Sequence, residues 1–248
     1  MGAPRHSRRA EAAAEMCGRY TLTSPGDVVA EVFELVDVPP ILPRYNMAPT
    51  QEAAVVRVVS RGAPRTLDLL RWGLIPTFAQ DPSIGNRMIN ARSESVADKP
   101  AYRDSFRSRR CLVVADGFYE WRKLDPKTKQ PHLIRRQDRR PFGFAGLWSW
   151  WQDRQAAAAP TIETFTILTT DPNDLLRPLH DRMPVILDRS DHAAWLDPAN
   201  RDAAHLKSLL VPAPVTGWEA IPVSRAVNSP DHDEPDCIEP LVGERPAS

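Results

Sequence analysis

The chain has 248 residues, of which 42% are apolar and 26% are charged, and its 32 basic residues balance its 32 acidic residues. This composition is typical of a soluble globular protein with a sizeable core, and neutral net charge argues against a nonspecific nucleic-acid coat. No apolar run approaches the roughly 20 residues that span a bilayer, and the first fifteen residues lack the apolar segment of a secretory signal. We therefore expect a cytoplasmic protein without membrane contacts.

The N-terminal part of the chain changes character at residue 16. Residues 1–15 contain no large apolar residue after Met1, so we expect a non-structural extension that is either mis-assigned or removed. A helix is predicted to begin at Ser24-Pro25-Gly26-Asp27, with Ser24 as its cap and Pro25 in its first turn. Apolar residues recur behind this start at helical spacing, at Val28, Val32, Phe33 and Val36.

Short runs typical of β-strands follow, with turns between them at 62–64 and 125–127. The runs are 53–59, 66–72, 111–115, 118–121, 142–148, 164–169 and 185–187, and short helices are predicted at 191–196 and 202–210. Strands in runs with helices outside them indicate one α+β domain, here 16–228, around a curved and mainly antiparallel sheet. Residues 229–248 are rich in proline and acid, which predicts a loose tail.

Basic residues cluster in the middle of the chain, whereas the last twenty residues are acidic. The cluster contains Arg87, Arg92, Arg103, Arg107, Arg109, Arg110, Arg122, Lys123, Lys127, Lys129, Arg135, Arg136, Arg139 and Arg140. Such a distribution fits a positive face that binds a polyanion. On charge alone, solvated surface arginines are the simpler interpretation.

Met16-Cys17-Gly18-Arg19-Tyr20 is the most informative segment, because loss of a methionine at position 16 would make Cys17 the N-terminal residue. The α-amine of such a residue has a pKa of about 7.7–8.0, against about 10.4 for lysine, so it can attack an aldehyde near neutral pH. The neighbouring thiol can then add to the imine and close a thiazolidine ring. The alternative is a buried cysteine that acts as a small apolar residue. The three cysteines (Cys17, Cys111 and Cys237) are scattered and odd in number, which fits neither a disulfide framework nor a C-x-x-C metal pair.

Three further segments carry groups suited to proton transfer or to anion binding. In Gly117-Phe118-Tyr119-Glu120-Trp121, strand alternation places Glu120 on the same face as Phe118, where burial would raise its pKa. His180, in Leu179-His180-Asp181-Arg182-Met183-Pro184, has the natural pKa for a proton shuttle. Asn90-Ala91-Arg92 supplies an amide and a guanidinium. Taken singly, Glu120 is better explained by a salt bridge to an arginine and His180 by a structural imidazole. A capped turn is the alternative for Asn90-Ala91-Arg92.

Together, these segments resemble the SRAP (SOS response-associated peptidase) family, the abasic-site processing proteins. The resemblance runs from Cys17 to about Asn228, and its specificity lies in the number and order of its motifs. Besides the segments already quoted, these are Arg44-Tyr45-Asn46-Met47-Ala48-Pro49, Arg71-Trp72-Gly73-Leu74-Ile75-Pro76, Asn90-Ala91-Arg92-Ser93-Glu94, Ala145-Gly146-Leu147-Trp148, Pro222-Val223-Ser224 and Val227-Asn228.

The resemblance implies a single α+β domain with a β-barrel-like core and a groove for single-stranded DNA. It implies that Cys17, Asn90, Glu120 and His180 are the catalytic residues, that Cys17 forms a Schiff base and then a thiazolidine crosslink with an abasic site, and that no metal or organic cofactor takes part. The DNA contacts it implies are Arg19, Asn46, Pro49, Trp72, Phe78, Arg92, Thr169 and Arg182. The expected partner is abasic single-stranded DNA near a single-strand/double-strand junction, bound by a monomer in the bacterial cytoplasm and at the nucleoid during damage.

Two departures from the family pattern bear on this expectation. A retained fifteen-residue extension would turn the Cys17 amine into an unreactive amide. Phe78 stands where many relatives have tryptophan, which weakens the stacking expected there. Two other functions fit the same residues: a cysteine-type peptidase or autopeptidase that uses Cys17, Glu120 and His180, and a noncovalent single-stranded DNA-binding module. If the protein forms the crosslink, we also expect it to have AP-lyase activity.

Overall fold

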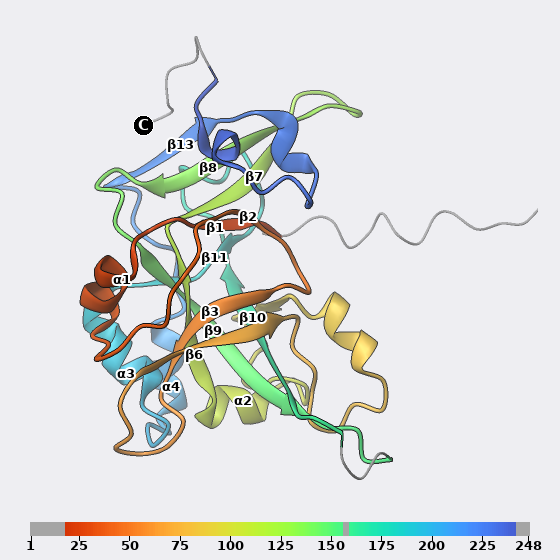
Figure 1. Cartoon of the computed structure of the whole chain (residues 1–248), viewed down its shortest axis with the longest axis vertical. Coiled ribbons are helices and arrows are strands. Elements are labelled where there is room, and N and C mark those ends of the chain that lie inside the picture. The colour runs from red at the N-terminus through yellow and green to blue at the C-terminus, as the bar shows by residue number, and fades with distance from the viewer. Residues whose placement is uncertain (1–17, 156–158, 242–248) are drawn as a thin grey trace, which may run out of the picture.

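Two β-sheets make up most of the protein in the computed structural model, which describes residues 18–155 and 159–241. One sheet has five strands in the order β13-β8-β7-β1-β2, and it lies at the top of Figure 1. The other has eight strands in the order β11-β10-β4-β3-β6-β9-β12, with β5 beside β10. The strands are β1 (Tyr20–Leu22), β2 (Arg44–Met47), β3 (Glu52–Arg57), β4 (Thr66–Trp72), β5 (Asn90–Arg92), β6 (Arg110–Ala115), β7 (Gly117–Lys123), β8 (Lys129–Arg136), β9 (Phe142–Trp151), β10 (Ile162–Thr170), β11 (Met183–Pro184), β12 (Ile186–Leu187) and β13 (Trp218–Pro222).

Five strands of the larger sheet close into a ring. β3 pairs with β4 and β6, β6 with β9, β9 with β10, and β10 returns to β4. All of these pairings are antiparallel except β4–β10. Closure removes the free edges that an open sheet would expose. Apolar residues such as Trp72, Phe144 and Phe165 are fully buried in the core, so the α+β class and the barrel-like core are confirmed.

Helices cover the outside of this framework (Figure 1). They are α1 (Gly26–Phe33), α2 (Arg103–Ser108), α3 (His192–Leu196) and α4 (Ala203–Ser208), with 3₁₀ turns η2 (Pro82–Arg87), η3 (Arg189–Asp191), η4 (Arg225–Asn228) and η5 (Pro235–Ile238). The cap of α4 is Asp202, whose carboxylate accepts a hydrogen bond from the backbone N–H of His205.

The first helix differs from its prediction at both ends. Ser24 does not cap it, because the Ser24 hydroxyl instead donates to Asp116 Oδ2 at 2.9 Å and Pro25 takes the cap position. The helix ends at Phe33, since Glu34 adopts the left-handed conformation with φ of 56°. Val36 therefore lies beyond the helix and is 94% exposed rather than part of the apolar stripe.

The expected loose tail is also wrong for residues 229–241. The Asp233 carboxylate accepts hydrogen bonds from the backbone N–H groups of Tyr45 and Asn46 and pairs with Arg44. Cys237 is fully buried, and the chain makes a β-bridge at Pro240. These contacts offset the low local hydrophobicity on which the tail prediction rested, so the folded part extends past residue 228. The expected extension at residues 1–15 lies outside the described residues.

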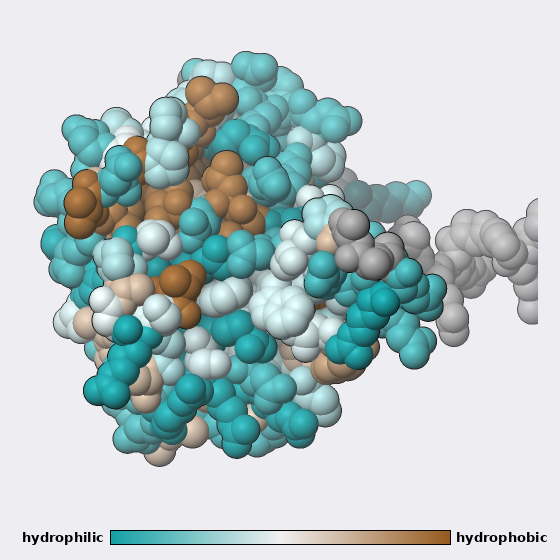
Figure 2. Space-filling view, turned by 60° about the horizontal axis from the view of Figure 1, so that its bottom comes forward, coloured by the Kyte–Doolittle hydropathy of each residue, from teal (hydrophilic) through white to brown (hydrophobic). Residues whose placement is uncertain are grey.

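One end of the molecule, brought forward in Figure 2, is largely hydrophilic, with hydrophobic residues gathered over one part of it. Among the described residues, no helix is long and apolar enough to cross a bilayer.

Candidate active site

A cavity of about 900 Å³ opens beside the five-stranded sheet. Its walls come from Gly18 and Arg19 before β1, from β7 with the hairpin that joins it to β8, and from the segment 177–181 after β10. Two of the four residues expected to be catalytic, Glu120 and His180, line it directly. A third, Cys17, lies outside the described residues.

The pairing of β1 with β7 brings the N-terminal segment to this cavity. Tyr20 lies opposite Phe118 and Thr21 opposite Gly117 in antiparallel register, and Tyr119 N–H donates to Arg19 O at 3.0 Å. Continued by two residues, this register sets Gly18 opposite Glu120. A Cβ at Gly117 would lie 2.8 Å from both Leu133 and Thr21. A larger residue at this position would therefore force the Leu133 or Thr21 side chain to move.

Glu120 is a buried carboxyl group at the wall of the cavity. It is 2% exposed, and its Oε1 has no hydrogen-bond partner among the described residues. Burial, followed by the nearby Asp181 carboxylate, raises the pKa of Glu120 well above its usual value. A carboxyl group whose pKa is raised holds its proton to higher pH than an exposed one, which suits it to general acid chemistry. The expected salt bridge between Glu120 and an arginine is not seen in the described part of the protein.

The alternation predicted for β7 is confirmed. Phe118 packs in the main core, whereas Tyr119 packs in a second apolar cluster with Leu133, Val223, Val227 and Cys237, against which Trp121 is partly buried. The sheet thus separates two cores, and Glu120 shares the face of the main one.

His180 is held by its own loop. Its Nδ1 accepts a hydrogen bond from the backbone N–H of Arg182 at 3.0 Å, and Asp181 Oδ1 lies 3.1 Å from the same nitrogen. Arg182 O also lies 3.3 Å from this nitrogen, so Nδ1 has one donor and two acceptors within reach, and its role depends on which ring nitrogen carries the proton.

Asn90 and Arg92 lie on β5, which pairs in parallel with β10 and places Arg92 beside Thr169. Asn90 is 6% exposed and follows Ile89, which lines the cavity. Gly73 makes this placement possible, because its φ is 127° and a Cβ there would lie 2.5 Å from Gly85 O. Arg92 is exposed.

Arg19 reaches the cavity but is engaged within the protein. Its guanidinium donates to Asn46 Oδ1 at 2.9 Å and to Val227 O at 2.7 Å, and burial lowers its pKa. Asn46 is fully buried, and its Nδ2 donates to carbonyl groups of Val227, Ser229 and His232. Asn46 therefore orients Arg19 and joins the N-terminal strands to the C-terminal segment, and it presents no surface of its own.

Arg182 is likewise paired inside the protein. It donates to both carboxylate oxygens of Glu94, at 2.6 and 3.0 Å, to Asp171 at 3.1 Å and to Thr169 O at 2.6 Å. This pairing lowers the pKa of Glu94. Thr169 itself is fully buried. Arg182 thus fixes the loop that carries His180 and has less freedom to bind phosphate than an unpaired arginine.

The remaining expected DNA contacts differ in accessibility. Pro49 lines the cavity, and Phe78 is 58% exposed but does not line it. Trp72 is fully buried in the barrel, where its Nε1 donates to Ile89 O at 2.9 Å. Its apolar packing leaves no face for a base to stack on in this conformation, so the structure gives Trp72 a role in positioning β5 rather than the contact expected of it.

Several cavity residues were not among the expected site residues. Lys123, Lys127 and Lys129, which we call the lysine hairpin, line the cavity from β7, β8 and the turn between them, and Arg177 and Asn228 line it as well. The basic cluster in the sequence was the only signal for the lysines. His132, 8% exposed, lies directly opposite Glu120 on β8. No local pattern in the sequence of β8 indicated this position, because it depends on the pairing of β8 with β7.

One group of side chains could hold a metal ion away from these residues. Single ligand atoms of His232, Asp236 and Cys237 all lie within 4.8 Å of one another. His232 Nε2 is already bonded to Asp236 at 2.7 Å, and burial raises the pKa of the Cys237 thiol. Since a thiol must lose its proton to bind a metal, these bonds favour a structural role for the group.

The protein is a single α+β domain with a closed barrel and an attached five-stranded sheet. A basic cavity in it is lined by a buried carboxyl group and a histidine, which makes the cavity a candidate site for acid–base chemistry. The family model described as SOS response associated peptidase (SRAP) matches residues 16–230. The chain therefore belongs to the SRAP family.

Named relatives cover nearly the whole chain. The abasic site processing protein YoqW of Bacillus subtilis is 44% identical over 227 residues, which are 90% of this chain and 99% of the relative. The abasic site processing protein YedK of Escherichia coli is 31% identical and is matched over 91% of this chain and 100% of its own length. Among solved structures, a protein from Bacteroides thetaiotaomicron has a TM-score of 0.79 at 25% identity, covering 91% of this chain and 100% of its own.

Proposed function

We propose that this protein processes abasic sites in DNA by forming a covalent crosslink through Cys17 as its N-terminal residue. The observation that carries the proposal is the position of Gly18 at the wall of a basic cavity opposite Glu120. The names of the relatives, abasic site processing proteins, support the same substrate.

The reaction balances with the groups present. The Cys17 α-amine adds to the aldehyde carbon of the ring-opened deoxyribose, and the resulting carbinolamine loses water to give an imine. The thiol then adds across the C=N bond, its sulfur to carbon and its proton to nitrogen, which closes the thiazolidine. The Glu120 carboxyl group supplies the proton to the leaving water, and His180 returns protons between the two steps. Asn90 positions the sugar.

The proposed substrate is single-stranded DNA near a junction with a duplex. The lysine hairpin, whose three residues line the cavity, provides the charges that a phosphate backbone needs. The protein acts as a monomer in the cytoplasm, without metal or organic cofactor. AP-lyase activity would arise where the imine escapes capture by sulfur.

A denaturing gel tests this function directly. The protein that starts at Cys17 is incubated with single-stranded DNA that carries one abasic site, and with the same strand intact. We expect a slower-migrating, heat-stable species with abasic DNA alone. A noncovalent binding module would give no such species with either strand, and a peptidase would cleave a peptide substrate while leaving both DNA strands unmodified.

The arginines expected to contact phosphate should separate into two groups. Arg92 is exposed, whereas Arg19 and Arg182 are held by protein acceptors. Arg92→Ala should therefore weaken binding to single-stranded DNA and reduce the salt slope of affinity by about 0.7, the value for one phosphate contact on a single strand. Lys127→Ala should do the same.

Arg182→Ala should instead lower thermal stability and crosslinking rate, with less change in the salt slope. The measurement is fluorescence anisotropy of a labelled oligonucleotide at four or more salt concentrations, with Arg189→Ala, away from the cavity, as the matched control. Equal salt slopes for Arg92→Ala and for the unsubstituted protein would show that Arg92 does not contact phosphate and that DNA binds to another face.

A further inference from the structure

A second pocket, of about 390 Å³, lies outside the candidate active site. It is formed by segments far apart in sequence: the turn between β3 and β4, the end of α2, Trp148 on β9, and the loop between α3 and α4. In Figure 1 α2 lies at the bottom of the molecule, whereas β7 and β8 lie at the top. The pocket and the proposed crosslinking cavity share no lining residue.

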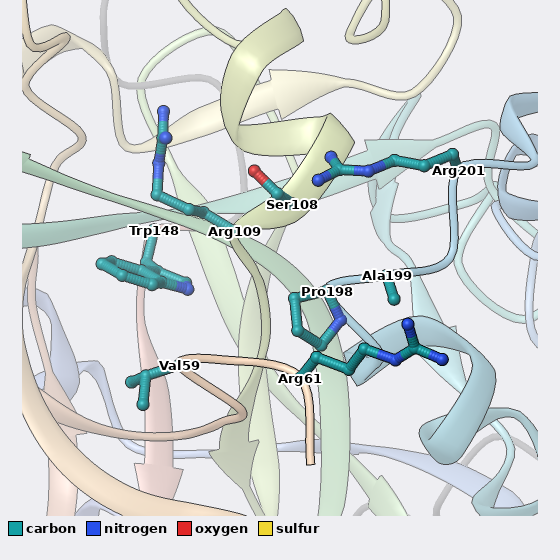
Figure 3. A pocket seen from close by; sticks show the side chains of 8 residues that line it. All are labelled: Val59, Arg61, Ser108, Arg109, Trp148, Pro198, Ala199 and Arg201. Atoms are coloured by element: carbon teal, nitrogen blue, oxygen red, sulfur yellow. The ribbon is translucent and has the colours of Figure 1, made fainter. Parts of the chain in front are cut away.

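The lining of this pocket is positive and lacks acids. Its eight lining residues include Arg61, Arg109 and Arg201, and none is a carboxylate. Figure 3 shows the three guanidinium groups spread around the rim, with Arg109 on the side of Trp148 and Arg61 and Arg201 on the other. Within residues 18–155 and 159–241, none of the three arginines forms an ion pair, although many other arginines of the protein do.

The wall also contains hydrogen-bond donors without acceptors. Trp148 is 8% exposed, and its Nε1 has no hydrogen-bond partner among the described residues. The same holds for Arg109 Nε. Buried donors are nearly always paired, so two of them in one wall mark an excess of donors over acceptors. In Figure 3 the indole nitrogen lies at the edge of the Trp148 ring that is turned toward the other lining residues.

Trp148 is held firmly in this position. The Arg57 guanidinium lies 4.4 Å from the centre of its ring, and Arg57 is itself fixed by Asp68 and by both carboxylate oxygens of Glu163. A cation over the ring draws electron density from the indole and strengthens its N–H as a donor. The donor that lacks an acceptor is therefore a rigid part of the barrel wall.

We propose that this pocket is a second anion site that binds a phosphate group. Phosphate supplies several acceptor oxygens and one or two negative charges, which match buried N–H donors and guanidinium groups that form no ion pair. Arg109 and Arg201 each donate one hydrogen bond to a neutral acceptor of the protein and keep further N–H groups for a ligand. Its volume is at the small end of ligand pockets and admits one phosphate with part of an attached nucleoside. Two sources share this chemistry, a free phosphate or mononucleotide and a backbone phosphate of DNA.

The seven tryptophans of the chain give a direct test by ¹H–¹⁵N spectroscopy of their indole N–H groups. In Trp148→Phe the indole N–H resonance of Trp148 disappears, which identifies it, while the phenyl ring keeps an aromatic group under Arg57. The protein is titrated separately with inorganic phosphate, with thymidine 5′-monophosphate and with a ten-residue oligothymidine, and with sodium chloride at the same ionic strength. We expect the Trp148 resonance to shift and saturate with a phosphate-bearing ligand and to stay in place with chloride.

The variant Arg61→Gln distinguishes a site from a general charge effect. Arg61 is exposed and has no hydrogen bond within the described residues, so its loss should leave the fold intact. The apparent affinity of the Arg61→Gln pocket for the phosphate-bearing ligands should fall about threefold to tenfold, as expected for loss of one charged donor at a partly exposed position. Arg189→Gln, which neutralises an exposed arginine outside the pocket, should leave this affinity unchanged.

The order of affinities identifies the source of the phosphate. Saturation by oligothymidine at lower phosphate concentration than by the mononucleotide assigns the site to a DNA backbone, and the reverse order assigns it to a free ligand. A Trp148 resonance that no phosphate ligand moves, or that moves equally in Arg61→Gln, overturns the proposal. Neither result depends on crosslinking, so failure here and failure of the proposed function remain separate.

Discussion

Cys17→Ala in the protein that starts at residue 17 is expected to abolish the heat-stable adduct with abasic DNA and to retain an imine that borohydride can trap. The substitution removes the sulfur and keeps the α-amine, and Schiff-base formation needs only the amine. An imine that sulfur does not capture is open to β-elimination of the 3′ phosphate, so this variant should also cut the strand. The measurement is a denaturing gel with and without borohydride.

One extra residue placed before Cys17 makes the opposite change. It keeps the thiol and converts the amine into an amide, so neither the imine nor the thiazolidine should form. A cysteine peptidase would behave differently, since loss of the thiol would end its activity and the added residue would be tolerated or removed. Crosslinking at the usual rate by a protein that mass spectrometry shows to retain its extra residue would disprove the amine mechanism. The same comparison covers a chain that keeps residues 1–16.

Glu120→Gln should slow crosslinking by about 10²–10⁴-fold, the usual contribution of a positioned proton donor, without loss of DNA binding. Gln has nearly the same shape, but its amide cannot give up a proton to the leaving water. The rate is measured under single-turnover conditions, and Glu52→Gln, at an exposed position on β3, is the matched control. A rate within twofold of the unsubstituted protein would remove Glu120 from the mechanism.

The same variant has a signature in stability. Burial raises the pKa of Glu120 above its usual value of 4.5, so its contribution to folding is fully present below that value and is lost as pH rises through the folded pKa. Relative to the unsubstituted protein, Glu120→Gln should therefore gain stability as pH increases above about 4.5. Glu94, whose pKa is lowered by Arg182, has the opposite sign: its contribution is present above its usual pKa and is lost as pH falls. The free energy of unfolding in urea is measured across the pH range for the unsubstituted protein, for Glu120→Gln and for Glu94→Gln, and the two variants should differ from the unsubstituted protein with opposite pH dependence.

Local pattern was enough to predict the barrel strands. Thr66–Trp72 is β4 without any change of bounds, and the predicted turn at 62–64 contains Gly62 at φ of 78°, because apolar alternation and turn chemistry are properties of neighbouring residues. β8 was missed because its pattern is obscured by polar residues and a proline. Its place depends on β7 and β13, which no local window contains.

The candidate site was predicted at the level of residue types and less well at the level of contacts. Glu120 and His180 carry functional groups that the sequence displays, and both line the cavity. The pairing of Arg182 with Glu94, 88 residues away, is a tertiary contact, so sequence alone could not show that this arginine already has its acceptors. Burial of Trp72 follows from closure of the barrel and is equally invisible in one strand.

The bonds of Arg19 and Asn46 to residues 227–232 have a consequence for the order of synthesis. The ribosome makes the N-terminal strands first, yet the carbonyl groups that hold Arg19 belong to segments made last. A nascent chain consequently emerges with this cavity wall unfinished, and a prematurely terminated chain that ends before residue 227 lacks those acceptors altogether. Assembly of this wall thus coincides with the end of translation.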